Sequence, residues 1–170
     1  MKVFRKILDK VFSLVLYIGM TLLICMVLIV FINVVLRYGF SSGIRWGEEI
    51  PLVIVIWFTF IAMALGVKEN LHINISVLPK RIPFGFEKFL GILKYTLEII
   101  IGGIMFRYGI GLTQNGFRSF LPATHISNAI NYIILPISAI FIILYAFLYL
   151  IDEIKAKNHK ELVKEEIKNV

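Results

Sequence analysis

The sequence predicts an all-α integral membrane protein with four transmembrane helices. The chain is 59% hydrophobic and only 17% charged, whereas a soluble domain is typically about one-quarter charged. A chain of 170 residues has too small an interior to bury so much apolar surface, so a bilayer is the simplest environment for it. The apolar residues are also gathered into four long runs, and most of the charge lies between or beyond them.

Each run is long enough to cross the hydrocarbon core, which takes roughly 17–25 helical residues. The first run has no charge in 26 positions. At ~1.5 Å per residue it would reach ~39 Å, so we expect it to tilt or protrude. The second run has Pro51 in its first turn, where proline is tolerated, and Pro136 predicts a kink in the fourth. The predicted spans are residues 11–36, 50–67, 89–112 and 129–151.

The four spans are expected to form one membrane domain over residues 1–170. The loop between the second and third spans is too apolar for a free linker, so we expect a segment of it to lie along the membrane interface. The tail at 152–170 mixes five acids with five lysines and is typical of a solvated extension of the fourth helix.

The distribution of basic residues predicts how the spans are oriented. The N-terminal tail has four, the first loop two, the middle loop four, the third loop two and the C-terminal tail five. Because Lys and Arg gather on the cytoplasmic side, both termini and the middle loop are predicted to be cytoplasmic. The net charge of +7 is therefore attributed to membrane orientation and not to nucleic-acid binding.

A charged cluster lies between the first two spans and is predicted to face the periplasm. Three interpretations of it are open. Its acids could complement the positive end of the second helix, they could pair with nearby arginines, or the cluster could dock another protein. The candidate docking residues on this side are Arg37, Arg45, Trp46, Glu48, Glu49 and Arg118.

Several polar side chains lie within or beside the spans, where charge usually faces a bundle interior, a partner or water. Lys94 and Glu98 are i,i+4 neighbours in the third span, so they either neutralise each other or contact another subunit. Trp57 is in mid-span and faces lipid or a partner helix. His72 is expected at the cytoplasmic interface.

The sequence contains no recognisable enzyme motif. It lacks a Gly-rich phosphate loop ending in Lys-Ser/Thr. His72 and His125 fall on opposite sides of the membrane in the predicted topology, so they cannot share a metal ion. We therefore expect neither catalysis nor a cofactor. The glycines at 102, 103, 109 and 111 would let the third helix approach a neighbour closely, more readily within the monomer than in a dimer.

A set of residues spread along the chain resembles a known family. In order, these residues are Arg37-Tyr38, Trp46-Gly47-Glu48-Glu49, Trp57, Gly66, His72-Ile73, Pro79, Leu121-Pro122-Ala123 and Tyr132 to Pro136. They resemble the small membrane subunit, or Q subunit, of tripartite ATP-independent periplasmic (TRAP) transporters. The sequence departs from the family pattern at three positions, with Asn74 where Asp is frequent and Thr124 and Ser127 where Leu and Pro are expected.

This resemblance implies a non-catalytic part of a sodium-driven importer of organic acids, such as sialic acid or C4-dicarboxylates. A large membrane subunit would hold the sodium and substrate sites and move like an elevator. The small subunit would enlarge the stationary scaffold and help dock a periplasmic substrate-binding protein. The alternative is a small carrier or channel that acts alone as an oligomer, with Glu98 and the glycines lining its path. One acid within four spans is too few polar groups for that role.

Overall fold

The computed structural model describes residues 2–70 and 84–155. The expected interfacial segment with His72 and most of the C-terminal tail lie outside these residues. The described helices are α1 (Lys2–Gly39), η1 (Arg45–Gly47), α2 (Glu49–Lys68), α3 (Phe84–Gly116), α4 (Ala129–Tyr132) and α5 (Ile134–Lys155).

The predicted all-α fold is confirmed, because the described part of the chain contains four helical segments that are long and apolar enough to cross a membrane. Each predicted span lies inside one of them, and the helices extend beyond the apolar runs. α1 has 38 residues, which corresponds to ~57 Å of helix. The basic residues before position 11 continue the helix, since Lys and Arg are good helix formers.

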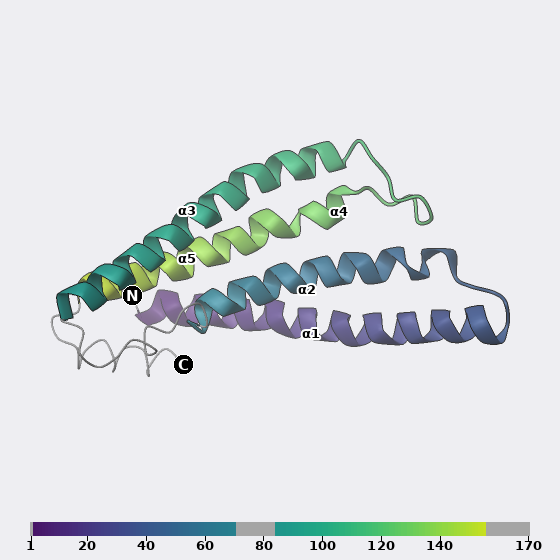
Figure 1. Ribbon diagram of the computed structural model, residues 1–170, viewed down its shortest axis with the longest axis horizontal. Helices are drawn as coiled ribbons and strands as arrows, with labels where there is room; N and C mark the ends of the chain where they lie inside the picture. The colour runs from purple at the N-terminus through teal and green to yellow at the C-terminus, as the bar shows by residue number, and fades with distance from the viewer. Residues whose placement is uncertain (1, 71–83, 156–170) are drawn as a thin grey trace.

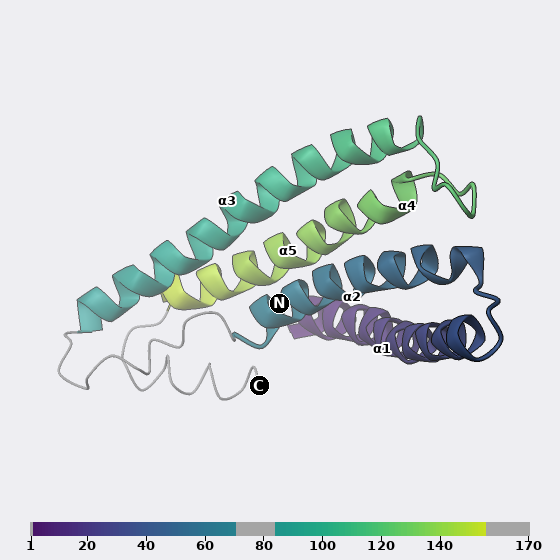
Figure 2. The same cartoon turned by 45° about the vertical axis from the view of Figure 1, so that its right-hand side comes forward.

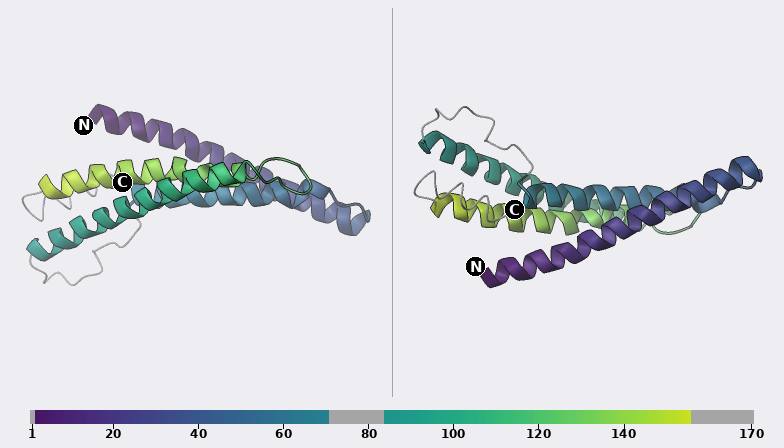
Figure 3. Two further views of the ribbon diagram at one scale, coloured as in Figure 1. Left: turned by 90° about the horizontal axis from the view of Figure 1, so that it is seen from above. Right: turned by 90° about the horizontal axis from the view of Figure 1, so that it is seen from below.

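The helices lie side by side in the order α1, α2, α5, α3 (Figures 1 and 2). The middle helices are the more buried: 39% of the most apolar window of the α2 span and 44% of that of the α5 span lie inside the fold, against 6% for α1 and 17% for α3. α1 crosses the other helices at an angle when the row is seen from above or below (Figure 3). Both long outer helices therefore keep broad apolar surfaces uncovered.

The row has two distinct ends. The loops 40–48 and 117–128 lie together at one end, here called the hairpin end (Figure 1). The start of α1 and the finish of α5 lie at the other, here called the terminal end. Hydrogen bonds and close packing at both ends join the α1–α2 hairpin to the α3–α5 hairpin.

Glycines bring α3 and α5 into close contact. A Cβ atom at Gly102 would lie 2.7 Å from Ile143 Cγ1, and one at Gly109 would lie 3.0 Å from Leu135 Cβ. Gly103, in contrast, has no such neighbour within 4 Å. The prediction of packing within the monomer is confirmed for Gly102 and Gly109, whose missing side chains let the helices approach.

The fourth span is interrupted near the hairpin end. α4 ends at Tyr132 and α5 begins at Ile134. Pro136 has no N–H to donate to the carbonyl oxygen of Tyr132, and its ring crowds that carbonyl. The helix is therefore interrupted at Ile133, one turn before the proline, and the kink itself stays a prediction.

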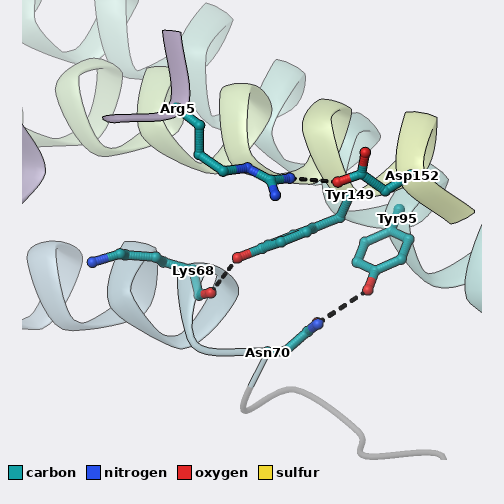
Figure 4. Close-up of polar contacts among 6 residues, drawn as sticks. All are labelled: Arg5, Lys68, Asn70, Tyr95, Tyr149 and Asp152. Carbon is teal, nitrogen blue, oxygen red and sulfur yellow. Dashed lines mark hydrogen bonds and ion pairs between the residues drawn. The ribbon is translucent and has the colours of Figure 1, made fainter. Parts of the chain in front are cut away.

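Tyrosines of α5 join the helices at the terminal end. Phe12 of α1 is fully buried and meets the Tyr145 ring edge-on, with 5.7 Å between centroids. The Tyr145 hydroxyl donates to Asp9 Oδ1 at 3.0 Å, and the Tyr149 hydroxyl donates to the Lys68 carbonyl oxygen (Figure 4). These contacts attach both α1 and α2 to α5.

Asn70 completes the terminal end by connecting α2 to α3. It follows α2 with a φ of 56°, a left-handed conformation that asparagine tolerates just after a helix. Its side chain is bonded to the Tyr95 hydroxyl at 3.2 Å (Figure 4) and accepts from Lys94 Nζ at 2.7 Å. Arg5 of α1 forms an ion pair with Asp152 of α5, so all four long helices meet here.

Candidate docking surface

The first loop at the hairpin end is built around a buried asparagine. Asn33 of α1 is only 8% exposed, and its Oδ1 accepts a hydrogen bond from the Ile44 amide at 2.8 Å. Gly47 lies directly against it, since a Cβ there would be 2.6 Å from Asn33 Cγ. Only glycine fits this approach without moving the asparagine. The contact fixes η1 on the end of α1.

η1 and the second loop present exposed cations and an aromatic ring. Arg45 is exposed, Trp46 is 43% exposed, and Arg118 is exposed in the loop after α3. Neither arginine takes part in an ion pair with any residue in 2–70 or 84–155. These three predicted docking residues therefore remain available to a partner.

Arg37 and Glu48 neutralise each other at the surface. Arg37 Nη1 lies 3.1 Å from Glu48 Oε1, so one of the expected internal ion pairs is present. The two side chains are 63% and 75% exposed. An ion pair this accessible to water stabilises a fold by only about 0–1 kcal/mol, so it can be exchanged for contacts with another molecule.

Glu49 behaves differently from its neighbour. Its Oε1 accepts from the Ala123 amide at 2.6 Å, and its Oε2 accepts from the Thr124 amide at 2.9 Å and the Thr124 hydroxyl at 2.8 Å. We call this arrangement the Glu49 clasp. None of the three interpretations of the charged cluster anticipated it, because the donors lie 74 and 75 residues away in the other hairpin.

The second loop, residues 117–128, is ordered by its own backbone and by Ser127. Phe120 and Ser127 form an antiparallel bridge. The Ser127 hydroxyl donates to the Gly116 carbonyl at 3.0 Å and accepts from the Ala129 amide at 3.2 Å. It thereby connects the end of α3 to the start of α4. Ser127 and Thr124, which depart from the family pattern, each have a defined structural contact.

Trp57 contacts a helix of its own chain. Its indole Nε1–H donates to the Ile130 carbonyl oxygen of α4 at 2.7 Å, and its side chain is partly buried. A buried indole N–H usually finds such an acceptor. The indole N–H therefore faces a helix of this chain, and what the partly exposed ring contacts stays a prediction.

The two predicted polar residues of α3 have different surroundings. Lys94 reaches toward the terminal end and bonds to Asn70, as expected for a lysine that extends toward the membrane surface. Glu98 lies deeper, and its Oε2 is buried without a hydrogen-bond partner among the described residues. This oxygen is covered by the chain itself and does not face outward.

The described residues bring together no cluster of metal-binding side chains. They contain no set of three or more His, Cys, Asp or Glu side chains that could hold a metal ion. The prominent surface is instead apolar, and contiguous apolar surface on this scale marks contact with lipid or another protein. Examples from α1 and α3 are Ile24, Leu28, Phe31, Leu97, Ile100 and Ile104.

Four spanning helices in a row, with an apolar exterior and a polar hairpin end, define a multi-pass membrane protein. Comparison with known proteins then identifies its family. Residues 26–156 match the family described as "Tripartite ATP-independent periplasmic transporters, DctQ component". The chain therefore belongs to the DctQ family of TRAP transporter components, and the resemblance seen in the sequence is confirmed.

Individual relatives agree with this assignment. The chain is 32% identical over 131 residues to a TRAP transporter small permease protein of Haemophilus influenzae, covering 72% of this chain and 76% of that protein. It is 29% identical over 83 residues to the C4-dicarboxylate TRAP transporter small permease protein DctQ of Vibrio cholerae, covering 45% and 36%. It is 24% identical over 110 residues to the isethionate TRAP transporter permease protein DctMQ of Oleidesulfovibrio alaskensis, covering 64% of this chain and 17% of that protein.

Proposed function

We propose that this chain is the non-catalytic small membrane subunit of a sodium-coupled TRAP importer of organic acids. It resides in the bacterial inner membrane with both termini in the cytoplasm. It enlarges the stationary scaffold of a large membrane subunit and helps dock a periplasmic substrate-binding protein. It needs no cofactor of its own, and sodium binds in the large subunit. The carried anion belongs to the sialic acid or C4-dicarboxylate class.

The observation that carries this proposal is the open row of helices. A carrier that works alone needs a polar path between helices, whereas Trp57 of α2 and Lys94 of α3 make contacts that hold the row together, and the buried Glu98 oxygen is covered by the chain itself. The exposed apolar faces of α1 and α3 suit a larger membrane partner. A relative whose name combines DctM with DctQ supports such a partner, because it joins both components in one polypeptide.

The docking role is supported by the chemistry of the hairpin end. Arg45, Trp46 and Arg118 are exposed there, and Arg37 and Glu48 form an exchangeable pair. Arginine and tryptophan are the residue types that contribute most energy at protein interfaces. The distribution of basic residues in the sequence predicts that this end faces the periplasm, where a soluble binding protein would approach.

The test is purification with the candidate partners. The chain is co-expressed with the large subunit from the same source, reconstituted in nanodiscs and titrated with the substrate-binding protein. The double variant Arg45→Glu, Arg118→Glu should still assemble with the large subunit. It should bind the substrate-binding protein about tenfold more weakly or worse, because charges at the edge of an interface steer and orient association. The control Lys155→Glu, at the terminal end, should bind like the wild type. Failure to co-purify with the large subunit would contradict the scaffold role, and unchanged binding by the double variant would contradict the docking role.

A further inference from the structure

We propose that Glu49 is a positioning residue, whose clasp on Ala123 and Thr124 holds the loop 117–128 against η1 so that the two hairpins present one docking surface. The inference rests on the proposed function and assigns Glu49 a role within it. Glu49 acts through the loop and not by touching the binding protein.

The geometry of the clasp supports a positioning role. Both carboxylate oxygens are occupied, by two consecutive backbone amides and one hydroxyl at 2.6 to 2.9 Å. Hydrogen bonds to an ionised acceptor are roughly twice as strong as neutral ones. Because the donors belong to an irregular turn, no helix or sheet could supply another acceptor for them. The carboxylate thus fixes the loop backbone itself.

The place of Glu49 in the chain explains what the clasp aligns. Glu49 is the first residue of α2 and comes two residues after η1, which carries Arg45 and Trp46. η1 is in turn fixed to α1 by Asn33. A loop bound to Glu49 is therefore held at a fixed position relative to η1. Arg118 belongs to that loop.

A second hydrogen-bonded contact joins the hairpins on this side, among the residues that the structure describes. Trp57 of α2 bonds to the Ile130 carbonyl of α4, eight residues or ~12 Å of helix from Glu49. The Trp57 contact joins the helices, whereas the Glu49 clasp joins the loop. Loss of Glu49 alone should therefore loosen the loop and leave the helices packed.

A double-mutant cycle tests the inference on the complex with the large subunit in nanodiscs. The variants are Glu49→Gln, Thr124→Val and the two combined, and the readout is the Kd of the substrate-binding protein. We expect Kd to rise about tenfold for Glu49→Gln and about threefold for Thr124→Val. The Kd of the combined variant should also rise only about tenfold and not thirtyfold, because the effects of two residues that act through one contact are not additive.

Two further measurements separate positioning from direct contact and from misfolding. Amide hydrogen exchange at Ala123 and Thr124 should speed up in Glu49→Gln, while exchange in α2 and α5 stays as in the wild type. The matched control Glu69→Gln makes the same chemical change at the opposite end of α2 and should leave both readouts unchanged. If Glu49→Gln fails to assemble, the threefold loss in Thr124→Val still tests the inference by itself.

The outcomes distinguish this inference from the proposed function. Additive effects of Glu49→Gln and Thr124→Val would mean that Glu49 contacts the binding protein directly, which would overturn the inference. Faster exchange with an unchanged Kd would also overturn it. The docking proposal fails separately, if the double variant Arg45→Glu, Arg118→Glu binds like the wild type.

Discussion

The packing of α3 on α5 makes a sharp prediction, because two adjacent glycines have opposite environments. A Cβ at Gly102 would lie 2.7 Å from Ile143 Cγ1 and 3.4 Å from Ile142 Cγ2, whereas a Cβ at Gly103 meets nothing within 4 Å. Neither glycine has a positive φ, so alanine is allowed by the backbone at both positions. Gly102→Ala and Gly103→Ala therefore differ only in what the new methyl group contacts.

The expected difference in stability follows from two opposing terms. Alanine favours a helix over glycine by up to ~1 kcal/mol, and this gain applies equally to both variants. Overpacking a close-packed contact costs about 1–3 kcal/mol, and it applies to Gly102→Ala alone. Ile143 is β-branched and stiff at χ1, so it cannot easily move aside. Gly102→Ala should therefore have a free energy of unfolding about 1–3 kcal/mol lower than that of Gly103→Ala.

The assay is equilibrium unfolding of the isolated chain in mixed detergent micelles, followed by circular dichroism. Measuring the isolated chain excludes any contact between a partner and the open face of α3 at Gly103. Gly103→Ala should be as stable as the wild type or more so. Equal stability of the two variants would refute the close α3–α5 contact, and a less stable Gly103→Ala would mean that the outer face of α3 is packed.

Three other residues give predictions for the same assay. Trp57→Phe keeps an aromatic side chain but loses the pyrrole part of the indole, with its N–H and the bond to the α4 carbonyl, and should cost at least about 1 kcal/mol; no loss would place the indole N–H in another contact. Gly47→Ala should cost about 1–3 kcal/mol because its methyl group displaces Asn33; a neutral result would refute the close approach of η1 to α1. Tyr145→Phe removes the hydrogen bond to the partly buried Asp9 of α1 and should cost about 1 kcal/mol, whereas Tyr17 is 71% exposed and Tyr17→Phe should cost little. Equal effects of the two tyrosine variants would contradict the attachment of α1 to α5.

The sequence was sufficient to predict features that depend on local composition. The four spans follow from runs of apolar residues, the break after Tyr132 follows from Pro136, and the packing of Gly102 follows from its small size. The first two effects act locally along the chain, and the third marks where a helix can be approached closely without identifying Ile143 as its neighbour. The family could also be predicted, because residues such as Trp46 and Glu49 occur in a recognisable order.

The features that sequence reasoning missed depend on contacts between distant residues. Glu49 and Thr124 are 75 positions apart, and nothing in the sequence of either suggests the other. Asn33 gave a signal, since it is the only amide side chain in an apolar run of 26 residues. Its partner is a backbone amide, however, and every loop residue except proline offers one. The order of the helices in the row likewise depends on which faces pack, and apolar runs this continuous do not reveal it.

The central claim is that this chain works only as part of a larger transporter, and reconstituted transport tests it most directly. Proteoliposomes would contain the chain alone, the large subunit alone, or both, with the substrate-binding protein outside and a sodium gradient imposed. Uptake of labelled C4-dicarboxylate or sialic acid should appear only when both membrane subunits and the binding protein are present. Uptake by this chain alone would contradict the account, and so would full uptake by the large subunit without it.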